Sequence, residues 1–354
     1  MHSRQIHLLL GILIAITLAA CSRDATPTVF APTPAEATVP AATPTGEPFA
    51  LLMAPDAPPT KAAQLAVQAV EAFASEKGWA LRRATPGEDI LASGQPGNPA
   101  WVAVVASGYG QALSAAAQAH PDVRFIAMEE PGVQPLPNLL VVGGDNVRYD
   151  QVAFMAGLLA TIENSNDYVG WIGEADTTRG KIFQNGFRHG IRYACPRCRV
   201  FDFELSPSAD AAAGVSAAGQ LRENFIDTAS AIPGAAGEAG LADLAENGVR
   251  VAGAGPDLFR LVFADGAAPG AKSVLGEPAF RPDLLLPDLL ARFLSGESFP
   301  EAVPYSLENG GLEYAPFPNA WISSARQSYL QKILAEVAAG RLDIGIDPIT
   351  GEER

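Results

Sequence analysis

Two of the three cysteines in this chain, Cys195 and Cys198, form a C-x-x-C pair in the segment YACPRCRV. A structural zinc site needs four ligands, and neither a second cysteine pair nor a nearby histidine pair supplies the other two. Redox catalysis needs a thiolate of low pKa, as at the start of a helix, whereas this pair follows a predicted helix. Outside the cytoplasm, the spacing predicts a small disulfide before a strand at 199–205.

Histidines, the usual acid–base groups near neutral pH, are scarce in this sequence. His2 and His7 lie in the first twenty residues, which leaves His120 and His189 for the body of the chain. His120 ends a predicted helix and His189 lies in a Phe-rich one, so we expect structural or surface roles for both. Neither a G-x-S-x-G turn nor a metal-ligand spacing is present. We therefore expect a protein without catalytic activity, cofactor or metal.

Polar groups that directly follow predicted strands are the candidate ligand-binding residues. In open α/β sheets, ligands sit beyond the carboxyl ends of the strands. The loop SGYG offers the hydroxyl of Ser107, close backbone approach at Gly108 and the ring of Tyr109 for stacking on a planar ligand. The alternative is that SGYG only turns a strand into a helix.

The loop GEADTTRG offers Glu174 and Asp176, which could accept hydrogen bonds from sugar hydroxyls or an amine. In an acidic chain, solvated loop carboxylates are the alternative. Phe183 and Phe187 lie four residues apart on the helix predicted next, so they share a face. Phe183, the one nearer the loop, is either a shelf for a ligand or a core residue.

A glycine-rich turn, PGAAGEAG, follows the strand predicted within 225–232. Free amides at such a helix start can hold an oxygen or an anion, which makes Gly237 and Glu238 candidate ligand-binding residues. The G-x-x-G-x-x-G spacing differs from the dinucleotide fingerprint, so we expect no phosphate cofactor here.

The composition is that of a globular protein. The chain has 354 residues, 48% of them hydrophobic and 18% charged, which is enough for a sizeable core in one or two domains. Its formal net charge of −15 repels phosphate backbones and anionic lipid surfaces. We therefore expect no nucleic-acid binding.

Short β-prone runs alternate with helical patterns from Phe49 onward, which is typical of parallel sheets with crossover helices. There are too many units for one compact sheet, and GGDN at 143–146 is a predicted turn between two halves. The predicted strands are 49–54, 101–106, 124–128, 139–142, 168–173, 199–205, 225–232 and 249–255.

The N-terminus has the features of an export signal. Arg4 precedes an apolar run, residues 8–20, which is too short to span a bilayer alone. The sequence LAAC, residues 18–21, resembles the lipobox of bacterial lipoprotein signal peptides. The resemblance implies that residues 1–20 are removed and that Cys21 becomes a lipidated N-terminus on the extracytoplasmic face of a membrane. Residues 21–48, rich in Pro, Thr and Ala, are predicted to be a disordered tether.

Several segments in order resemble the BMP (basic membrane protein) family of substrate-binding lipoproteins, which includes purine-nucleoside binders. The resemblance covers nearly all of residues 49–347 and is carried by VVASGYGQALSAAAQAHPDVRFIAME, YDQVAFMAGLLAT, VGWIGEADTTRGKIFQNGFRHGI, VRVAGAGPD and ENGGLEYAPF.

The resemblance implies an α/β type I periplasmic binding protein fold, with two Rossmann-like lobes joined by a three-segment hinge. Lobe 1 would comprise 49–145 and 254–299, lobe 2 would comprise 146–253 and 300–347, and 348–354 would be a C-terminal tail. A small polar ligand, a nucleoside by default, would be trapped between the lobes and passed to the permease of an ABC importer. A ligand sensor that signals to a membrane receptor and a degenerate hydrolase are the alternatives.

The chain departs from the family at its ligand contacts. Asp56 is the sole acidic candidate in the loop after the first strand. At the return strand Gly255 stands where relatives have an acid that grips ribose, which leaves Asp257 as the candidate there. Gly276 stands in place of a lysine at the cleft rim. Without these groups, a nucleoside's hydroxyls would lack partners.

Overall fold

The computed structural model describes residues 49–85, 99–317, 320 and 322–354. The signal segment, Cys21 and the tether through residue 48 lie outside these residues. No helix in the described part of the chain combines the length and the apolar character that a membrane crossing requires.

The first sheet has six parallel strands in the order β11-β5-β4-β3-β1-β2. Its central strand β3 is buried at every position, because helices cover both faces of the sheet. The strands are β1 (Phe49–Met53), β2 (Ala80–Ala84), β3 (Trp101–Val105), β4 (Arg124–Met128), β5 (Leu139–Val147) and β11 (Val303–Tyr305).

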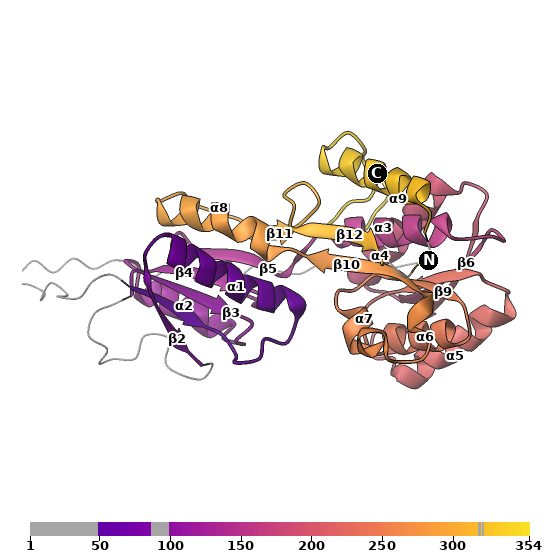
Figure 1. Ribbon diagram of the computed structural model, residues 1–354, viewed down its shortest axis with the longest axis horizontal. Coiled ribbons are helices and arrows are strands. Elements are labelled where there is room, and N and C mark those ends of the chain that lie inside the picture. The colour runs from indigo at the N-terminus through magenta and orange to yellow at the C-terminus, as the bar shows by residue number, and fades with distance from the viewer. Residues whose placement is uncertain (1–48, 86–98, 318–319, 321) are drawn as a thin grey trace, which may run out of the picture. The chain divides into compact units, whose positions relative to one another are not determined.

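Alternate residues of β3 divide between two hydrophobic clusters. Trp101, Ala103 and Val105 pack with α1 (Lys61–Glu76) and α8 (Pro282–Leu294), which lie side by side in Figure 1. Val102 and Val104 pack with α2 (Gln111–Ala119) on the opposite face. The two-residue period of a strand thus assigns each side chain to one layer of helices.

The second sheet also has six strands, in the order β12-β10-β9-β8-β6-β7, and only β12 runs antiparallel to its neighbour. The strands are β6 (Tyr168–Glu174), β7 (Arg199–Leu205), β8 (Thr228–Ala231), β9 (Arg250–Gly253), β10 (Val274–Phe280) and β12 (Leu312–Pro316). One hydrophobic cluster joins it to α3 (Tyr149–Ile162), α4 (Thr178–Ala194) and α9 (Ser324–Ala338), and another to α5 (Ala211–Glu223), α6 (Ala235–Glu246) and the short α7 (Leu258–Leu261).

Within the described residues, the chain passes between the two sheets three times, from β5 to α3, from β10 to α8 and from β11 to β12. The second passage comes after Phe280. Residues 254–280 therefore lie with the second sheet, whereas the whole of 254–299 was predicted to belong to lobe 1. β10 pairs with β9 and β12 in the second sheet, and only the part from α8 onward packs on the first. Likewise, β11 pairs with β5, so 303–305 belongs to the first sheet.

The segment GGDN, predicted as a turn, lies within β5. Gly143 and Gly144 have φ of +66° and +65°, and the strand continues to Val147 before the chain crosses at Arg148. The segment predicted as a turn is therefore a bend within a continuous strand, which the two glycines permit.

Cys195 and Cys198, the predicted pair, are joined by a disulfide in the structure. The Cys195 amide donates to the Ile191 carbonyl at 2.7 Å, so the bridge closes the turn directly after α4.

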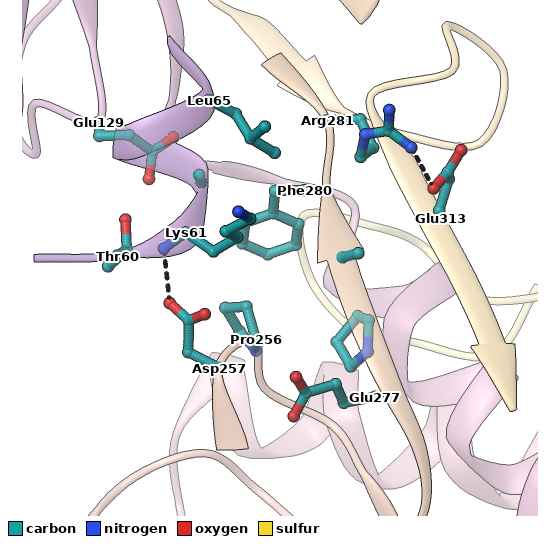
Figure 2. Close-up of a pocket in the computed structure, with 13 residues that line it drawn as sticks. Thr60, Lys61, Leu65, Glu129, Pro256, Asp257, Glu277, Phe280, Arg281 and Glu313 are labelled. Carbon is teal, nitrogen blue, oxygen red and sulfur yellow. Dashed lines mark hydrogen bonds and ion pairs between the residues drawn. The ribbon is translucent and has the colours of Figure 1, made fainter. Parts of the chain in front are cut away.

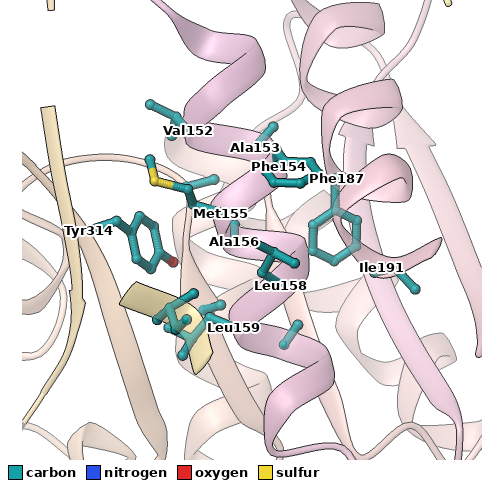
Figure 3. Close-up of a cluster of buried hydrophobic side chains, with 14 of the residues drawn as sticks. Val152, Ala153, Phe154, Met155, Ala156, Leu158, Leu159, Phe187, Ile191 and Tyr314 are labelled. Atoms are coloured by element: carbon teal, nitrogen blue, oxygen red, sulfur yellow. The ribbon is translucent and has the colours of Figure 1, made fainter. Parts of the chain in front are cut away.

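Glycines let α3 and α4 approach closely. A Cβ on Gly157 would lie 2.3 Å from the carbonyl oxygen of Phe187, and one on Gly190 would lie 2.1 Å from that of Phe154. Figure 3 shows Phe187 and Ile191 of α4 packed along α3, with Tyr314 of β12 on its other side. Bare backbone on both helices therefore permits this contact.

We expect Gly157→Ala to lower the free energy of unfolding by about 1–3 kcal/mol, because the added methyl group would force the two helices apart. Chemical denaturation of the purified protein measures this change. Gly219→Ala on α5 is the matched control, since its Cβ would meet nothing nearer than an Arg222 nitrogen at 3.9 Å. The control should be neutral or stabilising by about 0.5–1 kcal/mol, and equal losses in both variants would contradict the close-contact explanation.

Candidate functional site

A cavity of about 400 Å³ lies where elements of the first sheet meet elements of the second. The start of α1 and the residue after β4 contribute from one side, and the β9–α7 connection, β10 and β12 from the other. Figure 2 shows its lining: Thr60, Lys61, Ala62, Leu65, Glu129, Pro256, Asp257, Glu277, Pro278, Ala279, Phe280, Arg281 and Glu313.

Asp257 links the two sides of this cavity. It has φ of +62°, its residue surface is 8% exposed, and its Oδ2 accepts a hydrogen bond from the Lys61 amide at 2.9 Å. That amide lies in the first turn of α1, where the helix dipole favours a negative charge. Arg260, which contacts Asp257 Oδ2 at 3.4 Å, also donates to the Pro59 carbonyl at 2.8 Å. The β9–α7 connection is thus held against the start of α1.

Glu129 follows β4 directly and has a left-handed φ of +56°. Its carboxylate accepts a hydrogen bond of 2.5 Å from the Tyr305 hydroxyl. A Cβ at Gly143 would lie 2.6 Å from Glu129 Oε1, so the glycine leaves space for the carboxylate. Burial raises the pKa of Glu129, and the charge of Asp257 raises it further, against the hydrogen bonds from Tyr305 and the Gly144 backbone.

Glu277 lies on β10 and accepts a hydrogen bond from the Phe259 amide at 2.7 Å. Burial raises its pKa to about 7, and the nearby charge of Asp257 acts in the same direction. The hydrogen bonds from the Phe259 and Leu258 backbone and the charge of Arg260 oppose that rise. Near neutral pH, Glu277 is therefore poised to gain or lose its proton.

The two cations that line the cavity differ in their ion pairs. Arg281 makes a bidentate pair with Asp283, at 2.9 and 2.8 Å, and its third nitrogen contacts Glu313 at 2.6 Å. The Lys61 side chain is exposed and makes no ion pair with another described residue. Only the lysine is thus available to a ligand.

Of the residues predicted from the sequence, only Asp257 lines this cavity. Glu174 and Asp176 line a second cavity of about 520 Å³, together with Lys181 and residues of the C-terminal tail. Glu174 accepts a hydrogen bond from the Thr177 hydroxyl at 2.7 Å and contacts Arg179 at 3.4 Å. Glu174 is therefore tied into the start of α4, whereas Asp176 is exposed.

Gly237 and Glu238 lie in the first turn of α6. A Cβ on Gly237 would come within 1.9 Å of the Ile232 carbonyl oxygen, so the glycine is needed for packing. Gly237 and Glu174 line a recess of about 50 Å³, and Glu238 and Gly255 line another of about 10 Å³. The first holds little more than a water molecule or two, and the second is at the limit for one.

The SGYG loop is engaged by neighbouring backbone and by Glu130. The amides of Ser107 and Gly108 donate to the Glu130 carboxylate, and the Ser107 hydroxyl donates to the Met53 carbonyl at 3.0 Å. Tyr109 packs beside the cluster under α2. These contacts fit a loop that turns a strand into a helix.

The remaining predicted residues lie elsewhere. Asp56 is exposed after β1, and Phe183 is fully buried, with its ring centroid 5.2 Å from that of Tyr149. Phe183 thus occupies a core position. A Cβ at Gly255 would lie 2.9 Å from Pro233, so a larger side chain there would need a local shift of the backbone.

Sequence reasoning missed Glu129, Glu277 and Lys61. Glu129 carried a usable signal, because it directly follows a predicted strand, as the other candidates do. Glu277 carried none, since the strand that presents it was not among those predicted from periodicity.

Comparison with known proteins identifies the fold. No protein-family model and no curated protein matches the chain. A solute-binding protein of an ABC transporter system from Conexibacter woesei has a similar structure, with 16% sequence identity and a TM-score of 0.59 over 84% of this chain and 98% of that one. A transcriptional activator of the comK gene from Bacillus halodurans has 15% identity and a TM-score of 0.58, over 82% and 97%. An arabinose-binding protein from Geobacillus stearothermophilus has 13% identity and a TM-score of 0.52, over 76% and 97%. The chain thus has the type I periplasmic binding protein-like fold, with two α/β lobes.

We expect Glu277→Gln to stabilise the protein at pH 8 by about 1 kcal/mol. The whole pKa difference would correspond to a larger gain, but the side chain is only partly buried and solvent screens its charge. The folded-state pKa of about 7 lies above the ordinary 4.5, so ionisation costs stability as the pH rises through that interval. Denaturation at pH 8, 6.5 and 5 should show the advantage of the variant shrinking as the pH falls. An advantage independent of pH would contradict the role of the charge.

Proposed function

We propose that this protein is an extracytoplasmic solute-binding protein that captures a small polar ligand between its lobes and delivers it to an ABC importer. One observation carries the proposal: the cavity is lined from both lobes, by Glu129 beside the first sheet and Glu277 on the second. A ligand that contacts both would favour the arrangement in which the two sides lie together, which is how hinged binding proteins respond to their ligands.

The size and lining of the cavity support this reading. Small-molecule sites in proteins have volumes of roughly 300–1,000 Å³ and combine apolar walls with a few fixed polar groups. This cavity has about 400 Å³, with Leu65, Phe280 and prolines beside the acidic groups. The hydrogen bond from the Lys61 amide to the Asp257 carboxylate holds groups from both lobes in place.

Two classes of solute are candidates for the ligand. The resemblance to the BMP family makes a nucleoside the default, but Gly255 and Gly276 replace two of that family's ligand contacts. The neighbour from Geobacillus stearothermophilus binds arabinose, which makes a sugar the other solute to test. The proposed role is binding without catalysis and without a nucleic-acid partner.

A ligand-sensing role is the second candidate. The neighbour from Bacillus halodurans is named as a transcriptional activator, so the fold is not confined to proteins named for transport. In that role the same cavity would bind the solute, and the liganded protein would act on a membrane receptor in place of a permease.

We expect the purified protein to gain thermal stability with at least one solute from a panel of adenosine, guanosine, L-arabinose, D-galactose, glycerol and amino acids. Saturation at about 100 times the Kd adds roughly 2.7 kcal/mol, which raises the Tm by several degrees. Glu129→Gln and Glu277→Gln should reduce the shift, whereas Glu174→Gln, in the second cavity, should leave it unchanged. A shift that disappears only in Glu174→Gln would place the ligand in the second cavity.

We also propose that Cys21 carries the lipid anchor. Cys21→Ser should abolish incorporation of labelled palmitate and move the protein from the membrane fraction to the soluble one, because burial of acyl chains supplies about 0.8 kcal/mol per methylene. Cys195→Ser together with Cys198→Ser is the matched control and should still incorporate the label. Labelling that persists in Cys21→Ser would refute the anchor.

A further inference from the structure

We propose that the cavity takes an organic cation, a ligand with an ammonium or guanidinium group that is held between the carboxylates of Glu129, Asp257 and Glu277. This inference rests on the proposed solute-binding function and adds the chemical class of the solute. It differs from both the nucleoside and the sugar expectations, in which the ligand is neutral.

The lining of the cavity has an excess of negative charge. Four carboxylates, Glu129, Asp257, Glu277 and Glu313, face two cations, Lys61 and Arg281. Arg281 is already saturated by its bonds to Asp283 and Glu313. The three other carboxylates share the space with one further cation, Arg260, which contacts Asp257 at 3.4 Å from outside the lining, so the negative charge remains in excess.

Two of these carboxylates have no ion-pair partner in the described part of the chain. Glu129 is hydrogen-bonded by Tyr305 and Glu277 by the Phe259 amide, and both donors are neutral. Burial raises the pKa of both groups, and the charge of Asp257 contributes to both shifts. Even partial burial makes the charge of such carboxylates costly unless a positive charge joins them. A ligand cation would supply that charge.

Asp257 points to the same ligand class. It is more than nine-tenths buried and lines the cavity, and only its Oδ2 makes hydrogen bonds with described residues. Its Oδ1 has no such partner in the described part of the chain. A donor on the ligand could therefore bind Asp257 without breaking its tie to α1.

Lys61 does not neutralise this group of acids. Its charge lowers the pKa of Asp283, and its ammonium group makes no ion pair with Glu129, Asp257 or Glu277 in the described part of the chain. Because the Lys61 backbone amide, not the side chain, holds Asp257, the ammonium group can be removed without loss of that bond. Lys61→Gln should therefore strengthen the binding of a cation, whereas the carboxylate variants should weaken it.

The apolar part of the lining favours an organic cation over a metal ion. Leu65, Pro256, Pro278, Ala279 and Phe280 form a wall beside the acids. A hydrated metal ion gains nothing from such a wall, whereas the carbon skeleton of an amine buries surface against it. Glu129 has a left-handed φ of +56°, a conformation that is enriched at functional sites.

Isothermal titration calorimetry of the full-length protein tests the inference with putrescine, agmatine and choline as cationic probes. Adenosine, L-arabinose, D-galactose and CaCl₂ are the comparison probes. We expect at least one cationic probe to bind, and Glu277→Gln and Glu129→Gln to weaken it about tenfold or more each. Lys61→Gln should strengthen it several-fold, because a repelling charge is lost, and Glu174→Gln should not change it.

Titrations near pH 6.5 in buffers of different ionisation enthalpy supply an independent readout. A bound cation favours the ionised form of Glu277, so binding should release protons, and Glu277→Gln should abolish most of that release. Far-UV circular dichroism shows whether each variant is folded. If a carboxylate variant does not fold, Lys61→Gln still tests the effect of charge on binding.

The outcomes separate this inference from the proposed function. Binding of a neutral solute, with no cationic probe bound, would overturn the cation and leave the solute-binding role in place. Binding of calcium alone would overturn the organic cation. The failure of every probe and of the wider solute panel would overturn the proposed function itself. A cationic probe whose affinity falls in Lys61→Gln would also overturn the proposed charge balance.

Discussion

The hydrogen bond from the Lys61 amide to the Asp257 carboxylate joins an element of one lobe to an element of the other. Its position at the start of α1 adds the favourable field of the helix to the bond. Arg260 reinforces it through the Pro59 carbonyl. Because the cavity is lined by α1 on one side and by the β9–α7 connection and β10 on the other, its shape depends on this tie.

A second constraint concerns the charged side chains around that hydrogen bond. Glu129 follows a strand of the first sheet and Glu277 lies on a strand of the second, and each is partly buried beside Asp257 with a neutral hydrogen-bond donor. Folding brings three acids together at a cost that the rest of the molecule must offset. The cost falls when a positive charge enters the cavity.

Periodicity and turn chemistry predicted much of the fold. The runs predicted as strands at 101–106, 124–128 and 168–173 are the strands Trp101–Val105, Arg124–Met128 and Tyr168–Glu174. Sheet membership was predicted less well, because it depends on partners far along the chain. β10 joined the second sheet although the resemblance placed it in lobe 1, and β5 runs through two glycines that looked like a turn.

The sequence by itself determined the α/β class, the placement of acids after strands and the position of Cys21 directly after an apolar segment, since these follow from residue type and local spacing. Only the tertiary structure decided which of those acids share a cavity. Asp257 faces Glu129 and Glu277, whereas Glu174 and Asp176 line a different cavity and Asp56 remains exposed. The reason is physical: a site requires distances between residues more than a hundred positions apart, and those distances are set by strand order and by the packing of helices against sheets.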